Sequence, residues 1–245
     1  MAQSFGVVED KLHEADFFLD RLAEVRPHSR ESRYYFSAFV AAARTVTLSM
    51  QTSLSDTNGF QQWYECAQRE LKTNALARQF LEIRNTGAHE GRNPLNRIDF
   101  ANLAASLKKQ LAGDHSHELL LPACGPNKGS ILVDAVEAST SYFKLLVRIV
   151  FDCYEQFKCA VDPQWYFTES SFSSQGKRFA DALAEFGYPQ QWADFMPSVE
   201  DGWRILRSSQ PSCGINDLFE KYLGKVITGP DHNATNGSAP QAAPK

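Results

Sequence analysis

The chain has 245 residues, of which 43% are hydrophobic and 22% are charged, as is usual for a globular protein with one large domain or two small ones. Its formal net charge of −4 provides no global basic field, so any binding of nucleic acid must rest on a local patch. The N-terminus lacks the apolar segment of a signal peptide, and no run of about 18 apolar residues occurs. We therefore expect a cytoplasmic protein without a membrane span.

The cysteines and histidines give no sign of a metal site. Five cysteines are scattered along the chain without a Cys-x-x-Cys pair, so we expect reduced thiols rather than a zinc or redox motif. The segment His115-Ser116-His117 has no Cys or acid at ligand spacing, and we expect exposed loop histidines there. The sequence thus predicts neither a metal nor a cofactor.

The first half of the chain has the spacing of apolar residues that long helices require. This spacing predicts helices over 7–25, 31–53 and 60–88, the last broken near 72–74. Ser29 or Ser32 is suited to cap the second helix. That second helix is apolar on most sides, which is typical of a central helix.

The middle of the chain is less regular. Residues 95–129 form an insertion in which 98–111 resembles a short helix, and either a short hairpin or an irregular excursion fits the remainder. Residues 130–159 carry a wide apolar face and predict another long helix.

The C-terminal third has a different character. It is rich in aromatic residues and predicts short helices over 175–186, 190–195, 199–206 and 216–223. We expect its aromatic residues to build a core rather than to stack on bases; they are Trp165, Tyr166, Phe167, Trp192 and Trp203. The predicted organisation is an all-α fold with a four- to five-helix bundle over 6–160, a helical extension over 165–228 packed on that bundle, and a disordered tail over 229–245.

One hexapeptide combines residues that suit phosphate chemistry. Arg84-Asn85-Thr86-Gly87-Ala88-His89 ends the third helical pattern. Arginine offers a fork of donors to phosphate, and histidine moves protons near neutral pH. Asn85 and His89 are four residues apart, so they share a face if the helix continues that far. Gly87 costs a helix about 1 kcal/mol relative to alanine, so it either bends the helix or ends it before His89.

Further arginines surround the hexapeptide in the sequence. If Arg78 and Arg92 converge with Arg44 from the second helix, they form a cationic groove that binds the phosphates of a substrate. A solvated helix face explains the same residues equally well. Arg84 and His89 also suit a plain helix C-terminus, where the helix dipole favours cations.

The order of the helices and the position of the Arg-Asn-x-x-x-His motif resemble the HEPN superfamily of helical-bundle proteins, many of which are RNases with an Arg-x(4–6)-His motif. The resemblance covers residues 6–160 and leaves 165–228 without a counterpart. It implies a metal-independent endoribonuclease that works as a homodimer with both motifs in a shared cleft. Arg84, Asn85 and His89 would then be the catalytic residues, and RNA the substrate.

The resemblance also implies a biological setting, since such RNases often serve as toxins or as effectors of phage defence, with an antitoxin or regulatory protein as a partner. Two alternatives stay open at this point. One is a non-catalytic HEPN-like module that binds RNA, a nucleotide or a protein, and the other is an unrelated helical interaction protein with an accidental hexapeptide.

Overall fold

The computed structural model of the chain is mostly helical over the residues that it describes, as expected of an all-α fold. It describes residues 5–27, 29–90, 95, 117–122, 130–210 and 213–230. The chain divides into two compact units, residues 7–149 and residues 1–6 with 150–245, and the boundary lies within helix α6 (Ala135–Val161). The sequence pattern had suggested a boundary after that helix.

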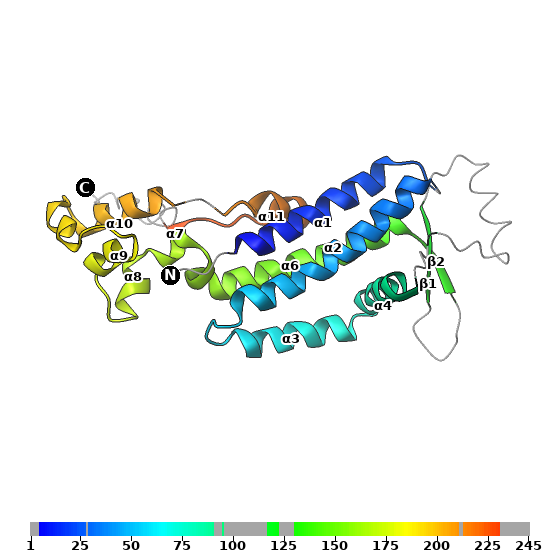
Figure 1. The fold of residues 1–245 in the computed structure, drawn as a ribbon, viewed down its shortest axis with the longest axis horizontal. Helices are drawn as coiled ribbons and strands as arrows, with labels where there is room; N and C mark the ends of the chain where they lie inside the picture. The colour runs from blue at the N-terminus through cyan, green and yellow to red at the C-terminus, as the bar shows by residue number, and fades with distance from the viewer. Residues whose placement is uncertain are drawn as a thin grey trace, which may run out of the picture. The chain divides into compact units, whose positions relative to one another are not determined.

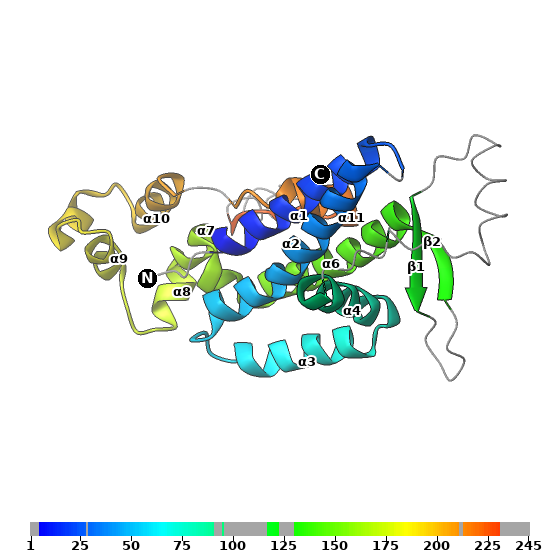
Figure 2. The ribbon, with the colours of Figure 1, turned by 45° about the vertical axis from the view of Figure 1, so that its right-hand side comes forward.

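In the described part of the first unit, four helices precede α6, and their bounds are close to the predicted ones (Figure 1). They are α1 (Gly6–Glu24), α2 (Arg30–Leu54), α3 (Phe60–Thr73) and α4 (Ala75–Glu90). In Figures 1 and 2, α1 lies alongside α2, and contacts join α4 to both α2 and α3. The predicted break within residues 60–88 is confirmed, because Asn74 separates α3 from α4.

Local residue chemistry sets these helix boundaries. The Ser29 side chain accepts a hydrogen bond from the backbone N–H of Ser32, which confirms Ser29 as the cap of α2. Gly59 has a φ of +80°, a conformation that favours glycine, and α3 begins directly after it. The Asn74 side chain accepts a hydrogen bond from the Ala77 backbone N–H at 3.0 Å and so caps α4.

A two-stranded antiparallel hairpin precedes α6. Strand β1 (Glu118–Pro122) pairs with β2 (Ser130–Asp134), with Glu118 opposite Asp134, which supports the hairpin rather than the irregular alternative. The prediction that a helix begins at Ser130 was wrong, because the apolar residues before Asp134 pair with β1. Asp134 instead accepts a hydrogen bond from the Glu137 backbone N–H at 2.9 Å and caps α6.

His117 corrects a second prediction. Its side chain is buried, and its backbone N–H donates to the Asp134 carboxylate at 2.7 Å. The expectation of an exposed loop histidine was therefore wrong for His117. The same prediction for His115 falls outside the described residues. The predicted helix 98–111 and residues 231–245 of the predicted tail also lie outside them.

The second unit consists of the end of α6 and a series of short helices. They are α7 (Pro163–Tyr166), α8 (Glu169–Ser173), α9 (Phe179–Glu185), η2 (Gln190–Phe195), α10 (Val199–Ser208) and α11 (Asn216–Leu223). The four predicted helices of this region correspond to α9, η2, α10 and α11, with η2 a 3₁₀ helix. The two helices α7 and α8 were not predicted, because each spans little more than one turn.

Aromatic residues form the core of α7 to α10. Tyr166, Phe167 and Trp203 are buried there, as predicted, whereas Trp192 is exposed. Gly202 allows α10 to approach α9 closely, since a Cβ atom at this position would lie 2.6 Å from Cζ of Phe179.

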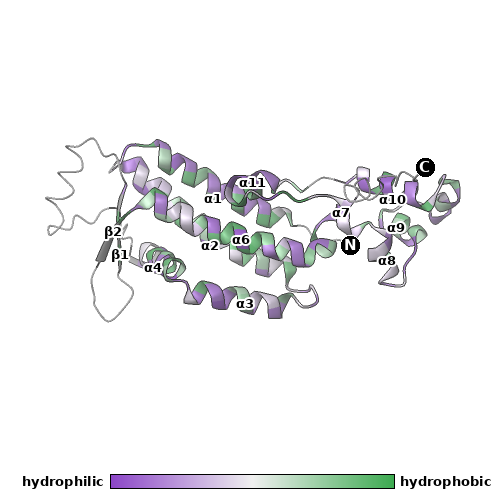
Figure 3. Ribbon diagram, turned by 180° about the vertical axis from the view of Figure 1, so that it is seen from behind, coloured by the Kyte–Doolittle hydropathy of each residue, from purple (hydrophilic) through white to green (hydrophobic). Residues whose placement is uncertain are grey.

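Apolar residues are distributed as expected for packed helices. Figure 3 shows polar and apolar residues alternating around the helices, with α6 among the most hydrophobic. None of the helices in the described part of the chain has both the length and the apolar character needed to cross a membrane.

Candidate functional site

The hexapeptide Arg84–His89 forms the C-terminal part of helix α4. The helix continues through Gly87 to Glu90, so Gly87 does not end it before His89. Asn85 and His89 therefore have the i,i+4 spacing of one helix face in the structure as well. Arg84, Asn85 and His89 are all exposed.

The two sides of α4 have distinct compositions. At about 100° per residue, Arg78, Asn85 and His89 fall within roughly 40° of one another, and each is exposed. We call the side of α4 that carries these three residues its outer face. The opposite side is the inner face, which buries Ala77, Phe80 and Ile83.

By the same rotation Arg84 falls within about 40° of Ala77 and Phe80 on the inner face, although its side chain is exposed. Its position is about 100° round the helix from Asn85, yet its Nη1 donates a hydrogen bond to Oδ1 of Asn85 at 3.2 Å. An arginine carries five N–H donors, so this bond leaves donors for an anion. The structure thus brings Arg84 and Asn85 into contact and places His89 one turn further along the same helix.

The inner face holds α4 against two other helices. The ring of Phe80 lies 6.2 Å from that of Phe36 and 6.1 Å from that of Phe39, both on α2. On α6, Tyr142 stacks on Phe80 with ring centroids 4.5 Å apart. Arg84 is one turn beyond Phe80, so this aromatic contact fixes the segment from which Arg84 projects.

Arg44 belongs to a different environment from Arg84. It is half-buried on α2, and its Nη1 donates to the Thr47 hydroxyl at 3.0 Å. Burial raises the pKa of the Tyr142 hydroxyl to about 12, and the nearby positive charge of Arg44 partly opposes this rise. Within the described residues, Arg44 thus bonds to Thr47 and lies near enough to Tyr142 to influence its pKa.

Two further arginines, Arg78 and Arg92, were also predicted to bind phosphates. Arg78 is exposed on the outer face, seven residues before Asn85. Arg92 lies outside the described residues. The structure therefore places one of the three predicted substrate-binding arginines, Arg78, on the same face as Asn85 and His89.

Two outer-face residues were missed by the sequence analysis. Leu81 and Glu82 lie between Arg78 and Asn85 in the sequence, and both are exposed. The same 100° rotation could have identified them, because it places Leu81 about 40° from Asn85 and Glu82 about 20° from His89. Glu82 adds a carboxylate to this face, and Leu81 adds apolar surface.

The structure and the sequence comparisons add two findings. Among the described residues, no group of three or more His, Cys, Asp and Glu side chains is arranged to hold a metal ion. Comparisons of the chain with protein-family models, with curated proteins and with solved structures find no match. A function is therefore inferred from the side chains of α4 and from the resemblance of the sequence to a known family.

Proposed function

We propose that the protein is a metal-independent endoribonuclease of HEPN type, with Arg84, Asn85 and His89 as its catalytic residues. One observation carries the proposal: α4 continues to Glu90, so it presents Asn85 and His89 to solvent on one face, with Arg84 bonded to Asn85. A histidine, an arginine and an amide exposed within six consecutive residues can supply the acid–base and charge-stabilising groups for RNA cleavage.

The proposed reaction uses the RNA 2′-hydroxyl as the nucleophile. His89 accepts the 2′-hydroxyl proton as the 2′-oxygen attacks the adjacent phosphorus, and the bond from phosphorus to the 5′-oxygen breaks. A protonated histidine returns a proton to the leaving 5′-oxygen. The products are a 2′,3′-cyclic phosphate and a 5′-hydroxyl, and DNA of the same sequence is not cleaved because it lacks the nucleophile.

Arg84 and Asn85 have supporting roles in this proposal. The guanidinium of Arg84 binds the scissile phosphate and stabilises the charge that develops on its oxygens. The amide of Asn85 orients Arg84 through the recorded hydrogen bond. Arg78, on the same face, binds a neighbouring phosphate.

The proposal includes a homodimer in which the outer faces of two α4 helices approach each other. The exposed side chain of Leu81 supports this arrangement, because it provides apolar surface beside Asn85. Two copies of the motif then face one substrate cleft, so that one His89 accepts a proton and the other donates one.

The test compares the wild-type protein with Arg84→Ala, His89→Ala and a control, Arg69→Ala. Arg69 is an exposed arginine on α3 and lies outside the motif. Each protein is incubated with mixed cellular RNA in EDTA, and the ends of the fragments are analysed. We expect cleavage by the wild type and by Arg69→Ala, and a loss of at least about 100-fold in both motif variants.

Two results would contradict the catalytic role. Equal cleavage by all four proteins would place the activity elsewhere or in a contaminant. Absence of cleavage, combined with RNA binding that Arg84→Ala weakens, would instead support the non-catalytic binding module. A role as a toxin predicts in addition that expression of the wild type, but not of His89→Ala, arrests growth of a bacterial host.

A further inference from the structure

The second unit exposes an unusual number of aromatic side chains around η2. Tyr188 is 42% exposed, Trp192 44% and Phe195 79%. Val199, the first residue of α10, is 55% exposed. We call these four residues the aromatic ridge, and large exposed apolar surfaces of this kind mark interaction sites more often than solvated surfaces.

The geometry of η2 groups the three aromatic residues of the ridge. Side chains three residues apart eclipse each other in a 3₁₀ helix, so Trp192 and Phe195 lie on the same side of η2. Tyr188 stacks on Trp192, with ring centroids 5.3 Å apart and planes inclined by 19°. The residues Ala193 and Met196 pack instead against the aromatic core, which anchors η2 to α9 and α10.

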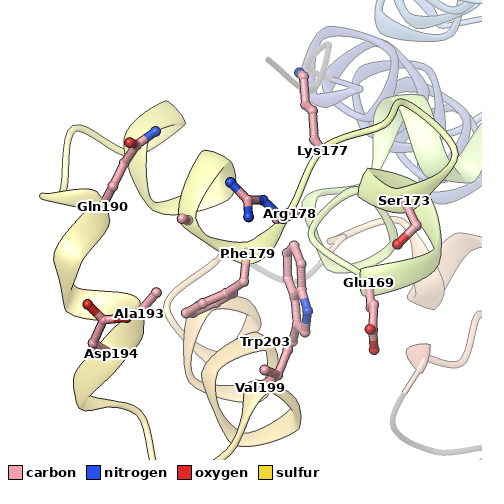
Figure 4. Close-up of a pocket in the computed structure, with 11 residues that line it drawn as sticks. Glu169, Ser173, Lys177, Arg178, Phe179, Gln190, Ala193, Asp194, Val199 and Trp203 are labelled. Carbon is pink, nitrogen blue, oxygen red and sulfur yellow. The ribbon is translucent and has the colours of Figure 1, made fainter.

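A cavity of about 480 Å³ adjoins the ridge, between α8, α9, η2 and α10. Figure 4 shows the rings of Phe179 and Trp203 next to each other in this cavity, with Asp194 on the η2 side. Val199 belongs to both the ridge and the cavity lining.

Charge around the ridge is predominantly negative. Asp194 and Glu200 are exposed beside it, Glu169 borders the cavity, and no ion pair is recorded for these three within the described residues. Two nearby cations are already paired, Lys177 with Glu185 and Arg204 with Asp201. Arg178 remains as an exposed cation at the cavity. An exposed surface with three carboxylates and one such cation attracts a basic ligand.

We propose that the ridge and its cavity bind a peptide segment of a partner protein that carries a bulky apolar side chain next to a lysine or arginine. The apolar side chain packs against Phe195 and Val199. The cation lies against Asp194 and the face of Trp192, where a cation–π contact adds to the charge attraction.

This surface suits a peptide better than RNA. Exposed aromatic rings can also stack on bases. A nucleic-acid site, however, needs cations to bind the phosphates, and the carboxylates of Asp194 and Glu200 repel phosphates instead. The inference concerns residues 169–203 and does not depend on the proposed function of α4.

The experiment uses a phage library that displays random short peptides. Phage that bind the Trp192→Ser, Phe195→Ser double variant are first removed, and the remaining phage are then selected for binding to the full wild-type chain. Enriched peptides are synthesised, and their affinities are measured by calorimetry for the wild type, Phe195→Ser, Asp194→Asn and the control Tyr34→Ser. Tyr34 is an exposed aromatic residue on α2, away from the ridge in sequence. Circular dichroism confirms that each variant is folded.

We expect enriched peptides with apolar and basic residues, about tenfold weaker binding to Phe195→Ser, and unchanged binding to Tyr34→Ser. Asp194→Asn is expected to weaken binding by about threefold at low salt. Failure to enrich any peptide, or enrichment of acidic peptides, would overturn the proposal. Self-association or binding of single-stranded RNA that Phe195→Ser abolishes would assign the surface to a second copy or to RNA and would also overturn it.

Discussion

On the inner face of α4, Phe80 is buried among aromatic rings of α2 and α6, whereas the outer face presents Arg78, Asn85 and His89 to solvent. The inner face has close aromatic contacts. The outer face has charges, an amide and an imidazole, and its Asn85 accepts a hydrogen bond from Arg84. One helix therefore carries a structural surface and a candidate chemical surface.

The difference between the two faces indicates that stability and activity can be varied independently. Exposed side chains away from caps and buried networks change the free energy of unfolding by only about 0.5 kcal/mol when replaced. Buried aromatic residues contribute several times more. A loss of activity in Arg84→Ala or His89→Ala would therefore report chemistry rather than unfolding.

The largest expected effect on stability comes from the inner face. Phe80→Ala removes a buried ring that contacts Phe36, Phe39 and Tyr142, and it should lower the free energy of unfolding by about 3–5 kcal/mol. Denaturant unfolding of Phe80→Ala and His89→Ala measures the contrast, since we expect His89→Ala to stay within about 0.5 kcal/mol of the wild type. Equal losses in the two variants would show that the faces are not separable.

The second effect concerns stability at alkaline pH. Burial raises the pKa of Tyr142 to about 12, so the folded protein retains this proton at a pH where the unfolded chain, with a pKa of about 10, has released it. The stability that results is complete below about pH 10 and is lost as the pH rises to about 12. From about pH 9 to about pH 11, the wild type should lose roughly 1.4 kcal/mol more than Tyr142→Phe.

Denaturant unfolding of both proteins at these two pH values checks this prediction. Other groups that titrate in the same range, such as the buried thiol of Cys153, are present in both proteins and cancel in the difference. An identical loss in the two proteins would indicate that water reaches the Tyr142 hydroxyl.

Much of the helical organisation could be predicted because its signals are local. Asn74 interrupts one apolar periodicity, and Ser29 precedes another, so the bounds of α2, α3 and α4 follow from residues near each boundary. The strand β2 could not be predicted in the same way. Residues 131–133 fit a helix face as well as a strand, and their partner residues in β1 decide between the two.

The candidate site was predictable only in part. The hexapeptide specifies Arg84, Asn85 and His89, and the helix period then gives Leu81 and Glu82 as neighbours. The approach of Arg44 to Tyr142 depends on how the bundle packs, because the two residues are too far apart in the sequence for a local pattern to reveal it. The exposure of Trp192 likewise depends on the short 3₁₀ helix that carries it, and composition alone suggested a core residue.

A smaller effect is expected at the beginning of α4. Asn74→Ala removes the side-chain acceptor for the Ala77 backbone N–H and should cost about 1 kcal/mol of stability. Asn74→Asp keeps an acceptor and serves as the control, with a loss of no more than a few tenths of a kcal/mol. Thermal and denaturant unfolding of the two variants measure the difference. A full loss in Asn74→Asp would show that the amide has a role other than capping.

The smallest expected effect is at Gly87, which lies in the last turn of α4 between Asn85 and His89. Gly87 is exposed and is not among the glycines with positive φ, so alanine can adopt the same helical conformation. Gly87→Ala should stabilise the protein by about 0.5 kcal/mol, less than the roughly 1 kcal/mol of a helix interior because helix ends fray. If α4 needs only to be continuous to present His89, RNA cleavage by Gly87→Ala should equal that of the wild type. Greater stability with lost cleavage would show instead that the proposed reaction requires the helix to bend at Gly87.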